Sequence, residues 1–225
     1  MRLLRLAAAC LALAGTAANA QKSEKQIDAR ALAVFERTKT TTATYALYSW
    51  NWVQDPEGNI RSEWAAEFHD GALHRVETPA ARLVANCLTG DGTIYDVASG
   101  DRWSEEWVAK AACGINSNIE LRALEWVGQA DSRFGPLETI RLIDAVNTRY
   151  YVVDTKGVLI ASEYFSRHDH VANCLQSEPL AVESRLPRDD LFTEASLEHS
   201  AVPEKFRQAP VAPSGGYWHS ARRCP

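Results

Sequence analysis

The sequence lacks the short motifs that mark the commonest classes of enzyme. It has no G-x-S-x-G turn, no H-E-x-x-H zinc motif, no phosphate-binding loop and no glycine fingerprint for a dinucleotide. The adjacent carboxylates of Glu105-Glu106 and Asp189-Asp190 fit helix starts better than acid–base catalysis. We therefore expect a protein that is not an enzyme and that uses no cofactor.

Positive charge is also scarce. The net charge of the chain is −5, and Arg222-Arg223 is its one short basic run. Proteins that follow a phosphate backbone carry a stripe of positive charge, which this sequence does not offer. Nucleic acid is therefore not an expected partner.

No apolar run is long enough to cross a bilayer. The first 20 residues contain two arginines, an apolar run over 6–14 and the cleavage-site pattern A-N-A. A membrane-spanning helix needs about 20 apolar residues, so 1–20 is predicted to be a cleaved signal peptide. We expect the remainder to be periplasmic or secreted, and not an integral membrane protein.

No linker rich in Gly, Ser or Pro divides the chain before its end. About 200 residues are enough to enclose one good core, so 21–202 is predicted to form a single domain. Residues 203–225 then form a Pro-rich tail.

Four cysteines lie beyond the predicted leader: Cys87, Cys113, Cys174 and Cys224. An even number in an exported chain favours two disulfides, although one bridge with two thiols, or a chemical role, stays open. Zinc is disfavoured because the four are widely spaced and form no C-x-x-C pair. Order along the chain favours Cys87 with Cys113 and Cys174 with Cys224, and the second bridge would anchor the tail.

The mature chain begins with one expected helix and continues with strands. Ser23 and Gln26 resemble a capping box, and Ile27, Val34 and Phe35 recur at helical spacing, so 23–38 is predicted to be an amphipathic helix. Turn signals then separate candidate strands at 43–54, 60–69, 72–78, 82–89, 92–97, 121–128, 137–145, 148–154, 157–166 and 170–184. A short helix is expected at 104–112, and an amphipathic piece at 189–199.

Two turns predict how the first strands pair. The sequence D-P-E-G-N fits a three-residue hairpin loop, which places Trp50 opposite Trp64 and Trp52 opposite Ser62. The pair Asp70-Gly71 fits a two-residue turn, and the register that follows places Phe68 opposite Leu73 and Ala66 opposite Arg75.

This register gathers large aromatic side chains on one face, which we treat as the candidate ligand-binding residues: Tyr48, Trp50, Trp52, Trp64, Phe68 and Leu73, with Arg75 at the edge. The other face mixes Leu47, Asn51, Arg61, Glu63, Glu67 and His74. The aromatic face has three interpretations: a core under the first helix, the wall of an apolar cavity, or a platform on which sugar rings stack against Trp50 or Trp52.

The second half of the chain carries a family resemblance. Over 121–165 a strand ending in W-V-G, the alternating strand L-E-T-I-R-L-I-D, the strand Y-Y-V-V-D and the turn T-K-G follow in order, and L-P-R-D-D-L-F-T-E closes the pattern at 186–194. This arrangement resembles the periplasmic lipoprotein-carrier superfamily, which includes carriers, an outer-membrane receptor and envelope-stress sensors.

The resemblance implies an α+β fold: a strongly curved antiparallel sheet, or half-open β-barrel, with helices on its concave side. It also implies a cavity for a lipid or an acylated, lipoprotein-like ligand. Either Arg61 or Arg75 could match the carriers' functional arginine, and the predicted register favours Arg75. The alternative is an envelope interaction or sensor protein of the same fold whose cavity is filled by its own helix.

One cluster permits a third function. His168 and His170 would share a face if they lay on a strand, and two imidazoles with a third ligand could hold a metal ion. They fall between two candidate strands, where a solvated loop is the simpler interpretation. A metal-dependent hydrolase therefore ranks behind both kinds of binding protein.

Overall fold

The computed structural model describes residues 25–54, 59–113, 120–145, 147–166 and 174–210 of the 225-residue chain. Its strands are β1 (Gln26–Ile27), β2 (Tyr45–Gln54), β3 (Ile60–Asp70), β4 (Leu73–Glu77), β5 (Ala81–Asn86), β6 (Asp91–Asp96), β7 (Arg102–Ser104), β8 (Ala123–Ser132), β9 (Gly135–Ile143), β10 (Asn147–Asp154), β11 (Leu159–Ser166) and β12 (Cys174–Glu183). Its helices are α1 (Ala29–Lys39), α2 (Glu106–Ala112) and the 3-10 helices η1 (Glu194–Glu198) and η2 (Glu204–Phe206).

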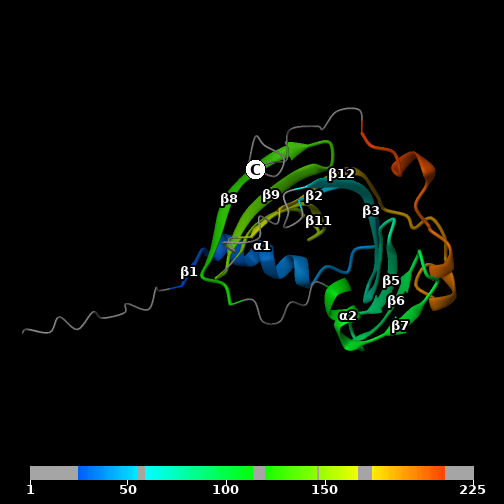
Figure 1. Cartoon of the computed structure of the whole chain (residues 1–225). Helices are drawn as coiled ribbons and strands as arrows, with labels where there is room; N and C mark the ends of the chain where they lie inside the picture. Colours follow the sequence, from blue (N-terminus) through cyan, green and yellow to red (C-terminus); the bar gives the residue numbers. More distant parts are fainter. Residues whose placement is uncertain (1–24, 55–58, 114–119, 146, 167–173, 211–225) are drawn as a thin grey trace, which may run out of the picture.

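All twelve described strands belong to one sheet, in the order β1-β8-β9-β10-β11-β12-β2-β3-β4-β5-β6-β7. Every neighbouring pair is antiparallel except β1 and β8, and β12 beside β2 joins the two halves of the chain. The sheet bends into an open arch with α1 and α2 beneath it on the concave side (Figure 1). This confirms the predicted fold class. No helix in the described part of the chain is long and apolar enough to cross a membrane.

The first helix begins later than predicted. The carboxylate of Asp28 accepts a hydrogen bond from the backbone N–H of Ala31 at 2.8 Å and so caps α1. Gln26 and Ile27 instead form β1. The backbone N–H of Gln26 donates to the carbonyl oxygen of Arg122 at 3.1 Å, and the N–H of Asp28, just after β1, donates to that of Leu124 at 2.9 Å. The predicted helix start at Ser23 is therefore wrong, and Ile27 is 41% exposed rather than packed beneath the helix.

The apolar stripe of α1 packs on the concave side of β8, β9 and β10. Ala31 and Val34 are buried in this contact, and Phe35 packs at its edge. Their partners on the sheet are Leu124, Ile140, Leu142 and Val153. Val34 and Phe35 therefore do what the helical spacing predicts.

The second helix covers the same face of the sheet at its other end. Ala109 and Ala112 of α2 pack on Ala85 of β5. Gly92 of β6 permits a close approach, because a Cβ atom there would lie 2.7 Å from the backbone nitrogen of Ala109. Strand β7, just before α2, was not predicted.

The register of the first hairpin is confirmed, since Trp50 pairs with Trp64 and Trp52 with Ser62. The second hairpin differs, because Gly71 and Ala72 form its turn and Phe68 pairs with Arg75. Gly71 has a φ of 61°, and a glycine with positive φ suits the first central position of a primed turn.

The predicted pairs of Phe68 with Leu73 and of Ala66 with Arg75 are therefore wrong by two residues. Ala66 instead faces Glu77. A shift of two keeps every side chain on its predicted face, because side chains alternate along a strand with a period of two.

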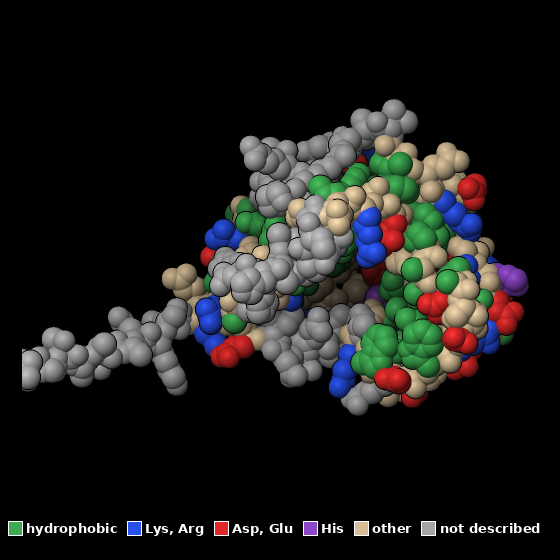
Figure 2. Space-filling model, in the orientation of Figure 1, with side chains coloured by type: hydrophobic (Ala, Val, Ile, Leu, Met, Phe, Trp, Pro, Cys, Tyr) green, Lys and Arg blue, Asp and Glu red, His purple; other side chains and the backbone are tan. Residues whose placement is uncertain are grey.

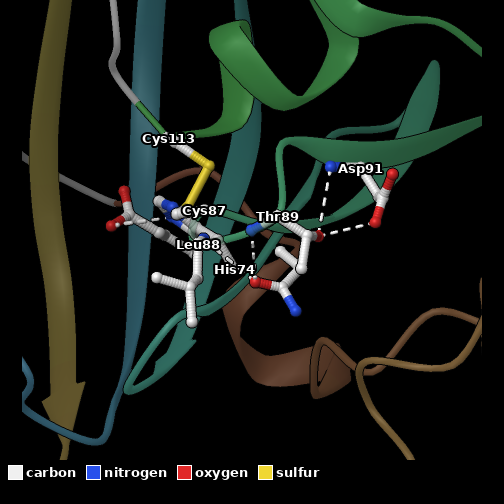
Figure 3. Close-up of a disulfide and its surroundings, with 8 residues drawn as sticks. His74, Cys87, Leu88, Thr89, Asp91 and Cys113 are labelled. Carbon is white, nitrogen blue, oxygen red and sulfur yellow. Dashed lines mark hydrogen bonds and ion pairs between the residues drawn. A yellow bond between two sulfur atoms is a disulfide. The ribbon is translucent and has the colours of Figure 1, made fainter.

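Cys87 and Cys113 form the predicted disulfide, which joins the residue after β5 to the residue after α2 (Figure 3). The bridge closes a sequence separation of 26 residues. Cys174, at the start of β12, is buried and also disulfide-bonded. Its predicted partner Cys224 lies outside the described residues, so this second pairing stays a prediction.

A concave trough as the candidate binding site

The predicted aromatic face lies on the convex side of the sheet. Tyr48, Phe68 and Arg75 are fully buried there, Trp50 and Trp52 are each 8% exposed, and Trp64 and Leu73 are half-buried. The interpretation that this face lies under the first helix is wrong, because α1 covers the opposite face. No structural contact tests whether these residues bind a ligand, and that role stays a prediction.

A segment from near the C-terminus covers much of the convex face. We call residues 186–206 the strap; it follows β12 and runs along the outside of the arch (Figure 1). Leu191 and Val202 of the strap pack in one buried cluster with Tyr48 and Phe68. Phe206 stacks on Tyr48 with ring centroids 4.2 Å apart. The aromatic face is therefore largely a core filled by the chain itself.

Arg75, on the convex side of β4, holds the strap against the sheet through hydrogen bonds. Its Nη1 atom donates to the carbonyl oxygen of Leu191 at 2.7 Å and to the hydroxyl of Ser196 at 2.5 Å. Its Nη2 atom donates to the carbonyl oxygen of His199 at 2.9 Å, and its Nε atom donates to Glu77 at 2.7 Å. The guanidinium thus satisfies strap carbonyls that would otherwise be buried without partners.

Glu77 holds the next part of the strap. Its carboxylate accepts hydrogen bonds from the hydroxyl of Ser200 at 2.6 Å and from the backbone N–H of Ala201 at 3.0 Å. Arg82 adds a bond from its Nη1 atom to the carbonyl oxygen of Leu197 at 2.8 Å. Arg75, which the sequence suggested for a ligand, therefore fixes the strap in place.

The concave side presents a different surface between α1 and α2. Strand pairing carries one row of residues from Ile140, which lies under α1, through Tyr151 to Ser162, Ser177, Asn51 and Glu63. We call the last four the polar row. Each of them is half-buried. The surface is hollowed in this central part of the molecule (Figure 2).

One end of this trough holds an acid–imidazole cluster. The Tyr45 hydroxyl hydrogen-bonds to Glu67, and His74 Nε2 lies 3.1 Å from the same carboxylate. The ring of His69 stacks on Tyr45, and its Nδ1 atom lies 2.7 Å from the carbonyl oxygen of Ala43. These side chains share the face of Asn51. Tyr45 precedes Asn51 by an even number of residues along β2, and Tyr45 pairs with His69 of β3, which pairs with His74 of β4.

The cluster shifts the protonation of two of its members. Burial, together with the neighbouring Glu67 carboxylate, raises the pKa of the Tyr45 phenol well above its ordinary range. Burial alone would raise the pKa of Glu67, but the charge and hydrogen bond of His74, with the hydrogen bond from Tyr45, lower it below its usual value. Glu67 is therefore a carboxylate at neutral pH, which strengthens its hydrogen bond with Tyr45 and its ion pair with His74.

The metal hypothesis finds no support in the described part of the chain, where no group of three or more His, Cys, Asp or Glu side chains could hold an ion. His168 and His170 lie outside the described residues. The sequence does carry a signal for the trough, because Asn51, Glu63 and Glu67 already fall on the mixed face. It gives no sign of Ser162 and Ser177, which come from β11 and β12 in the second half of the chain.

No protein-family model matches the sequence, and no curated protein matches it. Among solved structures, the chain is similar to a LolA superfamily protein from Nitrosomonas europaea, with a TM-score of 0.43 and 7% identity over 74% of this chain and 99% of that one. It is similar to a chain of the MucA/MucB complex of Pseudomonas aeruginosa, with a TM-score of 0.46 and 13% identity over 73% of this chain and 61% of that one.

A lipoprotein-sorting domain from Vibrio parahaemolyticus gives a TM-score of 0.38 and 7% identity over 75% of this chain and 98% of that one. Solved members of the predicted superfamily are therefore among the structures that this chain resembles.

Proposed function

We propose that this protein is a non-enzymatic binding protein of the cell envelope, and that its trough holds an extended segment of another envelope protein. The predicted leader supports export. The choice of a peptide as ligand rests on the polar row. Ser162, Ser177 and Asn51 present hydroxyl and amide groups, whereas an acyl chain would need apolar side chains at these positions.

A free lipid is the competing occupant, and the physical cost of burying polar groups argues against it. A hydroxyl or amide covered by an acyl chain loses its water and gains no partner, which costs about 1–3 kcal/mol for each group. A polypeptide instead brings N–H and C=O groups that can bond to the same side chains. The half-buried hydroxyls of Ser162 and Ser177 therefore suit a peptide better than a fatty acid.

The burial of the aromatic face beneath the strap also favours a peptide over a lipid. Tyr48 and Phe68 are fully buried beneath the strap, and the carbonyls that Arg75 binds hold the strap there. A lipid could reach this apolar wall only after these hydrogen bonds had broken. The convex face is thus better suited to stability than to exchange of a ligand.

The ligand class can be tested by changing the polarity of the trough. We expect the exported wild-type protein to yield no stoichiometric lipid on organic extraction and to bind a fluorescent fatty acid weakly. Replacing two polar groups in Asn51→Leu/Ser177→Val should raise affinity for the probe at least about tenfold, because about 1–3 kcal/mol is recovered per group.

Ser62→Val is the control for this experiment. Ser62 is exposed on the convex side of β3, so its replacement should leave probe affinity unchanged. Stoichiometric lipid in the wild-type protein, or equal probe binding by wild type and double variant, would contradict the proposal and restore the acylated ligand.

A further inference from the structure

A polar cavity of about 320 Å³ lies where α1 ends, beside the turn between β10 and β11. Its described lining residues are Arg37, Thr40, Thr41, Thr42, Ala43 and Lys156. Two cations and three hydroxyl groups are thus present, and none of these lining residues is acidic. Sites for small ligands begin at about 300 Å³, so the cavity can hold a small charged group.

Close backbone packing builds the wall of this cavity. Gly157 has a φ of 89°, and a Cβ atom at that position would lie 2.3 Å from the carbonyl oxygen of Arg37. Glycine is therefore needed for the turn to sit against the end of α1. This contact places Lys156, the preceding residue, on the same cavity as Arg37.

The cavity has an excess of positive charge. Arg37 Nη2 lies 2.6 Å from one oxygen of Glu138, and Arg30 Nη2 lies 3.1 Å from the other. Burial would raise the pKa of Glu138, but the hydrogen bonds of Arg37 and Arg30 lower it below its usual value. One carboxylate thus balances one of two guanidinium charges.

Lys156 adds a second positive charge, and it forms no ion pair within the described residues. Two groups near Lys156 carry negative charge. One is the carboxylate of Asp154, which accepts hydrogen bonds from the backbone N–H groups of Lys156 and Val158, and the other is the carbonyl end of α1. Lys39 in the last turn pairs with Glu36 at 2.9 Å, and Arg37 in the same turn offsets the partial negative charge of that helix end. The net charge around the cavity is therefore positive, which favours the binding of an anion there.

We infer that this cavity binds a phosphate group, either free or on the headgroup of an anionic lipid. A phosphate presents three acceptor oxygens, which matches a cavity lined by cations and hydroxyl groups. Phosphate binding here goes beyond the proposed function, since the polar row of the trough does not contribute to the cavity.

The test is calorimetric titration of the mature protein with inorganic phosphate and, separately, with monomeric short-chain phosphatidylglycerol. Lys156→Gln should weaken binding about fivefold, the effect of removing one unit charge about 4 Å from an anion in a water-like dielectric. Lys156→Arg should retain binding. Lys205→Gln is the control, because Lys205 is an exposed lysine of the strap and does not line this cavity.

Saturable binding of inorganic phosphate that Lys156→Gln weakens supports a free phosphate as the ligand. Binding of the lipid alone, with the same dependence on Lys156, supports a headgroup. The inference is overturned if neither ligand binds, or if Lys156→Gln and Lys205→Gln behave alike. Those results would leave the test of the trough unaffected.

Discussion

Arg75 shows how strongly one charged side chain can determine the shape of this protein. It is fully buried, and its partners come from both the sheet and the strap: Glu77, Leu191, Ser196 and His199. A buried guanidinium is tolerated when nearly all of its donors find acceptors. The strap carbonyls supply those acceptors, so the residue and the strap stabilise each other.

Arg75→Met should therefore destabilise the protein by about 3–5 kcal/mol, because it leaves the buried Glu77 carboxylate with only the more distant Arg82, 3.8 Å away, as a charged partner. Urea unfolding of the purified protein measures the change. Arg141→Met is the control, since its ion pair with Glu125 lies in a partly exposed part of the sheet and should contribute at most about 1 kcal/mol. Equal losses in both variants would show that Arg75 does not fasten the strap.

Glu67 predicts a dependence of stability on pH. Its pKa in the folded protein is lowered from the unfolded value of about 4.3, so its contribution is complete above that value and is lost as pH falls through the folded pKa. Glu67→Gln should cost about 1–3 kcal/mol at pH 7.

The difference between Glu67→Gln and wild type should then shrink as the pH falls below about 4.3 and through the lowered pKa of Glu67, where the wild-type carboxylate is also protonated. Denaturant unfolding of wild type and variant at pH 7 and at successively lower pH values measures this difference in the free energy of unfolding. Glu63→Gln, on the same face, should show a small and nearly constant effect. A cost of Glu67→Gln that does not change with pH would contradict the ionised cluster.

At the scale of elements, close packing of α2 on the sheet depends on Gly92. An added methyl group would meet the backbone of Ala109 at 2.7 Å, and a helix backbone cannot move aside as a side chain can. Gly92→Ala should destabilise the protein by about 1–3 kcal/mol. Gly128→Ala is the matched control, because that strand glycine has open space around it and should change stability by less than about 0.5 kcal/mol.

Thermal unfolding of both variants measures the difference. If Gly92→Ala proved as stable as Gly128→Ala, α2 would not be held as closely on β6 as the structure has it.

Local sequence patterns predicted most strands, but they did not predict the residue at which the first helix begins. Alternation and the D-P-E-G-N turn were sufficient to pair Trp50 with Trp64. Ser23 and Asp28 are both good caps in sequence, and pairing of Gln26 and Ile27 with β8 favours Asp28. That pairing joins residues nearly 100 positions apart, which no local pattern indicates.

The site could be predicted less well than the fold for the same reason. The aromatic face was correctly assembled, yet its cover comes from Leu191, 116 residues beyond Arg75. A buried arginine among aromatics indicates that acceptors must exist, but it does not say which segment supplies them. The polar row likewise depends on Asn51 and Ser177 becoming neighbours across β2 and β12.

At the scale of the whole molecule, the two faces of one curved sheet differ in what covers them. On the convex face the strap buries the aromatic side chains of β2 and β3, whereas α1 and α2 cover the two ends of the concave face and leave the polar row between them. An apolar surface closed by hydrogen bonds contributes stability, and a half-buried polar surface can exchange water for a partner. This difference is the reason why we propose the concave side as the binding surface.

Site-specific photocrosslinking during export tests this claim most directly. A benzophenone side chain is placed at Ser177 on the trough floor, or at Ser62 on the convex side of the same sheet, and the adducts are identified by mass. The account predicts a discrete polypeptide adduct from Ser177 and none from Ser62. A lipid adduct at Ser177, or the same polypeptide adduct from both positions, would contradict it.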